Sequence, residues 1–149
     1  MSQVVSIKRE MMIEAANRTV FTFFTAAECL VRWIGVSATL EPKPGGLLLI
    51  NVQDGLTARG EFTEVVPVSH LAYTWGWEGN RENVPPGSSI VEIDLSTEDG
   101  HTLLCFTHRG LPPEAVPSYA DSWSYYLRRL AMVASGKDPG HDQRAIRSW

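Results

Sequence analysis

The chain has 149 residues, of which 44% are hydrophobic and 20% charged, and a formal net charge of −4. This length suits a single globular domain, and no apolar run approaches the roughly 20 residues that a membrane span needs. The acidic balance, with no cluster of Lys and Arg denser than Arg128-Arg129, argues against a nucleic-acid partner. The N-terminus lacks the apolar segment of a secretory signal, so we expect a cytoplasmic protein.

Alternating apolar and polar residues predict a first strand at residues 5–13, with Arg9 as the one charged residue on its apolar face. Two short helices are expected to follow. Asn17 is the N-cap candidate of the first helix, and the capping-box pattern of Thr25 and Glu28 indicates the start of the second.

An Asp-Gly pair at positions 54 and 55 lies between two apolar runs and predicts a tight hairpin. With that pair at the centre of the turn, one face of the hairpin carries the pairs Leu47 with Phe62, Leu49 with Gly60 and Asn51 with Ala58. Glu64 would share that face unless a bulge intervenes. Leu48, Ile50 and Val52 would then form an apolar patch on the opposite face.

The next predicted strand is aromatic. It lies in the segment HLAYTWGWEG, residues 70–79, and alternation places Tyr73, Trp75 and Trp77 on one of its faces. Three large rings on one face could fill a core, line a ligand cavity or bind a partner protein.

A second Asp-Gly pair, at positions 99 and 100, predicts another hairpin. Its register gives the pairs Leu95 with Leu104, Ile93 with Phe106 and Val91 with His108. His108 therefore lies on the apolar face, where a neutral imidazole could bind a ligand or act as acid or base. The other histidines, His70, His101 and His141, are predicted to be solvated.

The last element is a long amphipathic helix that begins after Pro113 or Pro117 and ends at Gly136. Its apolar residues recur every three or four positions as Tyr119, Trp123, Tyr126, Leu127, Leu130 and Ala134. We expect one domain at residues 1–136 and a loosely held C-terminal tail at 137–149. A strand, two short helices, about six strands and a long helix fit an α+β architecture with an antiparallel sheet.

Three segments carry a resemblance to a known family: ARGEFTEVVPVSHLAYTWGW, IVEIDLSTEDGHTLLCFTHRGLP and SYADSWSYYLRRLAMVASG. Together with ECLVRWIG, they resemble the START-like (SRPBCC) superfamily, and within it the group of activator-of-heat-shock-protein-ATPase homologues, over roughly residues 5–136. The chain departs from the group's pattern at Ser122 and Ile34. The resemblance implies the helix-grip fold, in which a seven-stranded antiparallel sheet wraps the C-terminal helix around a hydrophobic cavity that binds apolar small molecules. The co-chaperone that names the group has a further N-terminal domain that we do not find here, so chaperone activation is not expected.

The residues expected to line the cavity are mostly aromatic, because such side chains bury an apolar body while an N–H or O–H reaches a polar group. They are Trp33, Phe62, Tyr73, Trp75, Trp77, Phe106, His108, Tyr119, Trp123, Tyr126 and Leu127. Ordinary core packing is the open alternative for each of them. The first hypothesis is therefore non-catalytic binding of a hydrophobic or aromatic small molecule.

Two other hypotheses remain open. One is a cyclase or hydrolase in which Glu64 and His108 form an acid/base pair inside the cavity. The other is a co-chaperone-like interaction module, including a homodimer, that pairs through the apolar patch of the first hairpin. No cofactor or metal is expected, because no His, Cys or acidic residues have ligand spacing, and Cys29 and Cys105 are predicted to be reduced thiols.

Overall fold

The computed structural model describes residues 6–53, 55–79, 83–144 and 149. The elements in chain order are β1 (Ser6–Ile13), α1 (Asn17–Thr25), α2 (Ala27–Leu30), β2 (Ser37–Leu40), β3 (Leu47–Gln53), β4 (Leu56–Val66), β5 (His70–Trp75), β6 (Ser89–Glu98), β7 (His101–Arg109), the short 3₁₀ helix η2 (Pro113–Ala115) and α3 (Val116–Ala134). The first position of the predicted strand at 5–13 lies outside the described residues. No helix in the described ranges is long and apolar enough to cross a membrane.

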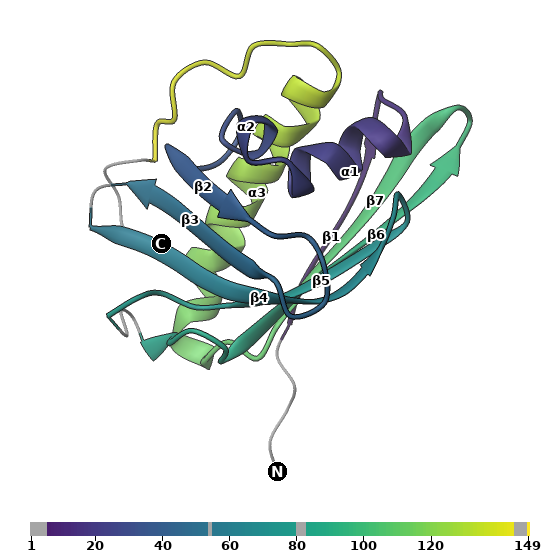
Figure 1. Ribbon diagram of the computed structural model, residues 1–149. Helices are drawn as coiled ribbons and strands as arrows, with labels where there is room; N and C mark the ends of the chain where they lie inside the picture. Colours follow the sequence, from purple (N-terminus) through teal and green to yellow (C-terminus); the bar gives the residue numbers. More distant parts are fainter. Residues whose placement is uncertain (1–5, 54, 80–82, 145–148) are drawn as a thin grey trace.

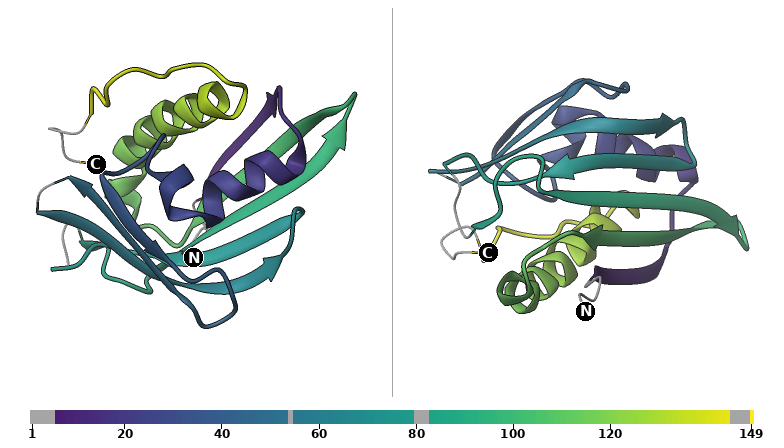
Figure 2. Two further views of the ribbon diagram at one scale, coloured as in Figure 1. Left: turned by 45° about the horizontal axis from the view of Figure 1, so that its top comes forward. Right: turned by 90° about the horizontal axis from the view of Figure 1, so that it is seen from below.

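The strands form one sheet in the order β1-β7-β6-β5-β4-β3-β2, and every neighbouring pair is antiparallel. The sheet curves, and α3 lies across its concave side (Figure 1). Figure 2 shows α1 and α2 beside α3 on the same side of the sheet. The predicted α+β helix-grip architecture is therefore confirmed.

The register of the second hairpin is as predicted. Val91 pairs with His108, Ile93 with Phe106 and Leu95 with Leu104. Because alternate residues of a strand share a face, this register turns His108 toward the core, where its side chain is completely buried.

The register predicted for the first hairpin is wrong by one residue over most of its length. Gln53 pairs with Leu56, as a two-residue turn requires, but a bulge before Gln53 shifts the next pair to Asn51 with Thr57. A shift of one residue exchanges the two faces of a strand. The predicted exposed patch is consequently buried: Leu48, Ile50 and Val52 are 1–2% exposed, and the interaction surface argued from it does not exist.

A second bulge lies in β4, between Phe62 and Glu64. Phe62 is fully buried. The bulge adds a residue at Thr63, so Glu64 is turned to the solvent side of the sheet and 61% of its side chain is exposed. The hypothesis that placed Glu64 inside the cavity with His108 is therefore wrong.

The two predicted helix caps are also wrong. Ala16 is the N-cap of α1, while Asn17 is its first helical residue and accepts a hydrogen bond from the Thr102 hydroxyl (2.7 Å). Thr25 donates its hydroxyl hydrogen back to the Phe21 carbonyl (3.0 Å) instead of capping α2. Tertiary and local contacts compete successfully for these polar side chains.

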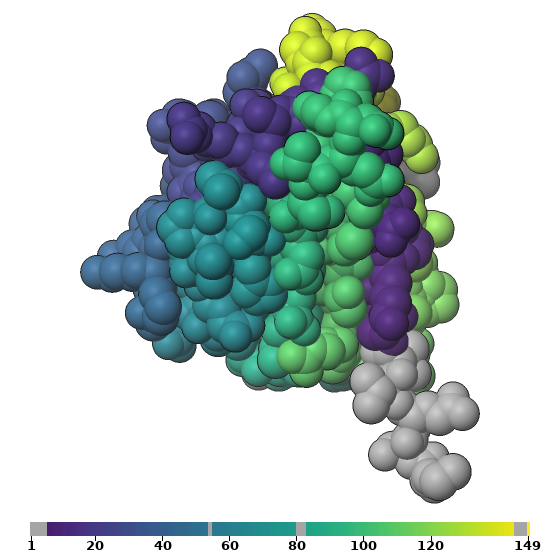
Figure 3. Space-filling model, turned by 90° about the vertical axis from the view of Figure 1, so that its right-hand side faces the viewer, coloured from purple at the N-terminus to yellow at the C-terminus, as the bar shows by residue number. Residues whose placement is uncertain are grey.

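The Arg9 misfit in β1 has a structural explanation. Its Nε donates to the Ser124 hydroxyl (2.9 Å) and its Nη2 to the Ala120 carbonyl (3.3 Å), both on α3. Figure 3 shows β1 in purple as the edge strand, alongside the green strand β7. Arg9 thus fastens one edge of the sheet to the long helix.

Candidate functional site

An aromatic cluster fills the space between the middle of the sheet and α3. Its members are Trp75, Trp77, Tyr119, Trp123, Tyr126 and Trp149. All are buried, and the first five were predicted from the sequence. We call this set the aromatic cluster.

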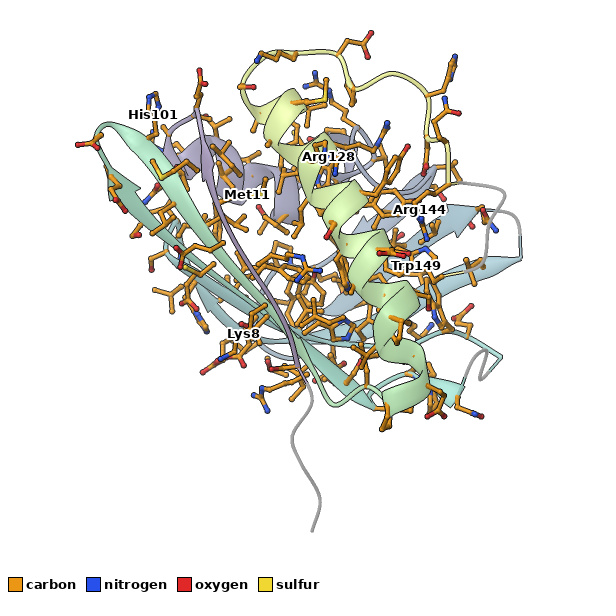
Figure 4. All side chains as sticks on the ribbon, turned by 180° about the vertical axis from the view of Figure 1, so that it is seen from behind. Lys8, Met11, His101, Arg128, Arg144 and Trp149 are labelled. Carbon is orange, nitrogen blue, oxygen red and sulfur yellow. The ribbon has the colours of Figure 1, made fainter. Side chains whose placement is uncertain are left out.

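The ring of Trp149 lies in the centre of the aromatic cluster. Its centroid is 5.0 to 5.6 Å from the centroids of the five other rings, and it stacks on Tyr126 with an angle of 12° between the planes. Figure 4 shows it against α3. Only 4% of Trp149 is exposed, so the prediction that this end of the tail is loosely held is wrong.

Gly76, between Trp75 and Trp77, allows a following segment of the chain to pass close to its backbone. A Cβ atom at this position would lie 2.0 Å from the Pro85 carbonyl oxygen. The segment after Trp77 can therefore return close to the strand, and the Trp77 backbone N–H donates to the Val84 carbonyl (2.7 Å).

His108 belongs to a buried hydrogen-bond chain behind the aromatic cluster. Its Nδ1 accepts from the Trp123 indole N–H (2.9 Å), so its Nε2 carries the hydrogen that is donated to the Ser89 hydroxyl (2.9 Å). Ser89 in turn donates to the Trp75 carbonyl (2.8 Å). Burial lowers the pKa of His108 to about 3, so the imidazole is neutral, positions Trp123 and has both nitrogens occupied.

Two indole N–H groups of the aromatic cluster differ in their bonding. Trp75 Nε1 donates to the Tyr119 hydroxyl (3.2 Å). Trp77 Nε1 is buried and has no acceptor among the residues that the structure describes. A buried N–H without an acceptor costs about 1–3 kcal/mol. Within the described part of the chain, Trp77 is therefore a donor that a ligand could use.

Glu64 contacts a different histidine on the outer face of the sheet. His70 Nε2 lies 3.0 Å from Glu64 Oε1, and His70 Nδ1 lies 2.7 Å from Asp94 Oδ1. Hydrogen bonding to Glu64, together with Asp94, raises the pKa of His70. Glu92 adds a third possible metal ligand within 4.8 Å, but both ring nitrogens of His70 already have carboxylate partners. His70 lies at the surface, as predicted, and its ring also contacts two carboxylates.

We expect the His70 contacts to stabilise the protein below about pH 6.5 and to lose this contribution as pH rises through the raised pKa. The test is the free energy of urea unfolding of wild type and His70→Gln between pH 5.5 and 8.5. The difference between them should be largest at the acid end. The lowered pKa of His108 has the opposite effect, because acidification then destabilises the folded protein. This contribution is the same in wild type and in His70→Gln, so it cancels in the difference between their free energies of unfolding.

His101→Gln is the matched control for that measurement, because His101 is exposed and lies at the far end of the β6–β7 hairpin (Figure 4). The free energy of unfolding of His101→Gln should depend on pH in the same way as that of wild type. A His70→Gln profile parallel to wild type at every pH would show that the two carboxylates do not stabilise the imidazolium.

Arg129 holds the described part of the tail against α3. Its buried guanidinium donates to the carbonyls of Trp33 (3.1 Å), Pro139 (3.2 Å) and Gly140 (3.0 Å). Further along, Tyr126 donates to Asp142 (2.7 Å), and Arg144 donates to Ser122 (2.9 Å). Burial, together with the Asp142 contact, raises the pKa of Tyr126. The tail is therefore bound along the helix that carries three rings of the aromatic cluster.

The remaining predicted site residues are buried outside the aromatic cluster, and they differ in whether they contact one of its rings. Phe106 contacts Trp123 with centroids 4.7 Å apart. Phe62 and Tyr73 form their own edge-to-face pair at 5.8 Å, and burial raises the pKa of Tyr73. Trp33 packs on Phe24 and donates to the Phe23 carbonyl (2.9 Å), while Leu127 is part of the common core.

Sequence reasoning missed three residues of this region: Trp149, Ser89 and Arg129. The signal for Trp149 was a lone large aromatic residue in an otherwise polar tail, because such a residue seldom stays in water. Ser89 and Arg129 had no signal in the linear pattern, since their partners come from distant segments.

An antiparallel sheet wrapped around a long helix, with an aromatic cluster between them, defines a START-like helix-grip protein. The family model described as "Activator of Hsp90 ATPase homolog 1-like protein" matches residues 14–135. This chain belongs to that family, within the START-like (SRPBCC) superfamily.

Individual relatives agree with this assignment. The solution structure of an AHSA1-like protein from Rhizobium etli is 44% identical, with a TM-score of 0.77, and the match covers 100% of this chain and 93% of that one. The human "Activator of 90 kDa heat shock protein ATPase homolog 1" is 29% identical over 106 residues, which are 71% of this chain and 30% of the relative. This chain thus spans about 30% of that relative's length.

A more distant structure shows the same fold. The Aha1 dimer from Colwellia psychrerythraea has a TM-score of 0.76 at 18% identity, and the match covers 89% of this chain and 97% of that chain. That homologue is described as a dimer, whereas a homodimer of the present protein stays a prediction.

Proposed function

We propose that this protein binds a hydrophobic, aromatic small molecule between the sheet and α3 without transforming it. The observation that carries the proposal is the aromatic cluster, in which rings at and just beyond the end of β5 and rings of α3 surround the ring of Trp149. Apolar walls with a few directed polar groups are typical of small-molecule sites.

Non-catalytic binding is favoured over acid/base chemistry by the state of the titratable groups. The neutral His108 has both nitrogens engaged by Trp123 and Ser89. Glu64 lies on the other face of the sheet with His70. The acid/base pair hypothesised from Glu64 and His108 is therefore not assembled.

The unused N–H of Trp77 favours a ligand that carries a hydrogen-bond acceptor. Quinoline and naphthalene have nearly the same shape, but only quinoline has an acceptor nitrogen. We expect quinoline to bind more tightly by the value of one neutral hydrogen bond, about 1 kcal/mol or roughly fivefold.

The test is titration of the wild-type protein with both probes, followed by the chemical shifts of aromatic carbons and by the melting temperature. Shifts should be confined to the aromatic cluster. Ligand at 100 times its Kd should stabilise the fold by about 2.7 kcal/mol and raise the melting temperature by roughly 5–10 °C.

Trp77→Phe should remove the preference for quinoline, because phenylalanine keeps a ring but has no N–H. Trp33→Phe is the matched control, since Trp33 is equally buried and contacts Phe24 outside the aromatic cluster. Unchanged shifts and melting temperature with millimolar concentrations of both probes would contradict the proposal.

A further inference from the structure

We infer that the ring of Trp149 occupies the ligand subsite of the aromatic cluster as an internal ligand. The subsite would take a planar bicyclic aromatic molecule in exchange for this side chain. This inference rests on the proposed function and adds the class of ligand and the control of its entry.

The geometry around Trp149 is that of a bound ring. Aromatic pairs prefer stacked or edge-to-face arrangements with centroids about 4.5–7 Å apart. The ring lies flat on Tyr126 and has its edge or face toward Trp75, Trp77, Tyr119 and Trp123, all within that range. The subsite therefore has the size of an indole and the stacking surface for one.

The walls of the subsite are carried by parts of the fold other than the tail. Trp75 ends β5, Trp77 is bridged to Ala58 of β4, and the three other rings stand on α3. Trp149 lies outside every helix and strand of the described residues. Removing its ring would leave an apolar cavity, and such a cavity stays dry and takes up a small aromatic molecule.

The ring of Trp149 fills the subsite but does not accept a hydrogen bond from the N–H group of Trp77. An indole N–H is a donor only, so the ring of Trp149 offers no acceptor to the buried Trp77 N–H. The two ring centroids are only 5.3 Å apart. A flat ligand with an acceptor at its edge, lying where Trp149 lies, can accept the hydrogen bond for which the described residues offer Trp77 no partner, and so compete with the side chain.

Occupation by Trp149 lowers the apparent affinity for any external ligand. If the subsite is free less than one-tenth of the time, the apparent Kd is at least tenfold higher than that of the open subsite. Removal of the ring by Trp149→Ala should lower the Kd by at least this factor. The suitable probe is 3-methylindole, which is the Trp149 side chain as a free molecule.

The experiment measures the Kd of 3-methylindole for wild type, Trp149→Ala and the control Trp33→Phe by calorimetry. Contacts between the probe and the Tyr126 and Trp75 rings are detected by nuclear Overhauser effects. We expect at least tenfold tighter binding to Trp149→Ala, no change for Trp33→Phe, and probe contacts that reproduce those of the Trp149 ring.

A second measurement does not require the variant to fold. Wild-type protein labelled with 5-fluorotryptophan gives a ¹⁹F signal for Trp149, assigned with Trp149→Phe. Saturation with quinoline should move this signal to the position of a solvent-exposed tryptophan, while the Trp33 signal stays in place. A Trp149 signal that stays at its buried position while quinoline is bound would overturn the inference.

The outcomes separate the two proposals. Equal Kd values for wild type and Trp149→Ala, with probe contacts in the aromatic cluster, would overturn the internal-ligand inference and leave the proposed function in place. Binding to Trp149→Ala alone would support the inference and contradict the proposed function of the wild-type protein. A folded Trp149→Ala protein that binds neither probe would overturn both, because Trp149 would then be a core side chain.

Discussion

Replacing Trp123 with alanine is expected to lower the free energy of unfolding by about 5 kcal/mol, the largest effect of any single change proposed for this protein. The ring is 1% exposed and contacts Phe106, Trp75 and Trp149. Loss of a buried tryptophan costs about 3–5 kcal/mol, and the unpaired Nδ1 of His108 adds about 1–3 kcal/mol. Urea unfolding at pH 7.5 measures the change.

Trp123→Phe separates the two contributions. Phenylalanine keeps most of the packing but removes the N–H that donates to His108, so we expect a smaller loss of about 1–3 kcal/mol. Equal losses for Trp123→Ala and Trp123→Phe would assign the whole effect to the hydrogen bond. A loss below 2 kcal/mol for alanine would contradict the tight packing of the aromatic cluster.

Arg129→Met is expected to destabilise the fold by about 2–4 kcal/mol, because hydrogen bonds from a charged donor contribute about 1.5–3 kcal/mol. Methionine fills the place of the aliphatic stem but leaves the carbonyls of Trp33, Pro139 and Gly140 without their donor. Urea unfolding gives the magnitude. Amide hydrogen exchange at residues 138–144 should accelerate, because the guanidinium joins this segment to α3.

The neighbouring Arg128 provides the matched control. It is exposed on the same helix (Figure 4), so Arg128→Met should change the stability by less than about 0.5 kcal/mol. Arg129→Lys keeps the charge but lacks the planar fork that reaches three carbonyls, so it should recover only part of the loss. Equal stability of Arg128→Met and Arg129→Met would contradict the structural role of the buried guanidinium.

The two hairpins show that the local sequence specifies the position of a turn but not the register of the strands that follow it. Both contain an Asp-Gly pair, and the residues that flank each pair face one another as a two-residue turn requires, Gln53 with Leu56 and Glu98 with His101. Asp54 itself lies outside the described residues. The second hairpin has regular pairing, so the turn alone locates His108 in the core. In the first hairpin, and again at Glu64, one extra residue in a strand reverses the faces. A bulge is decided by the neighbouring strand and the core beneath it, so the turn residues do not reveal it.

The amino-acid sequence by itself determined the order of the elements, the α+β class and most of the aromatic residues that meet between the sheet and α3. Hydrophobic period and turn residues are local, and they specify which side chains must be buried. Only the tertiary structure decided what fills the space that those side chains surround. Trp149 reaches the aromatic cluster across a large separation in sequence, and its burial depends on rings of β5 and α3 that are adjacent only in the folded chain.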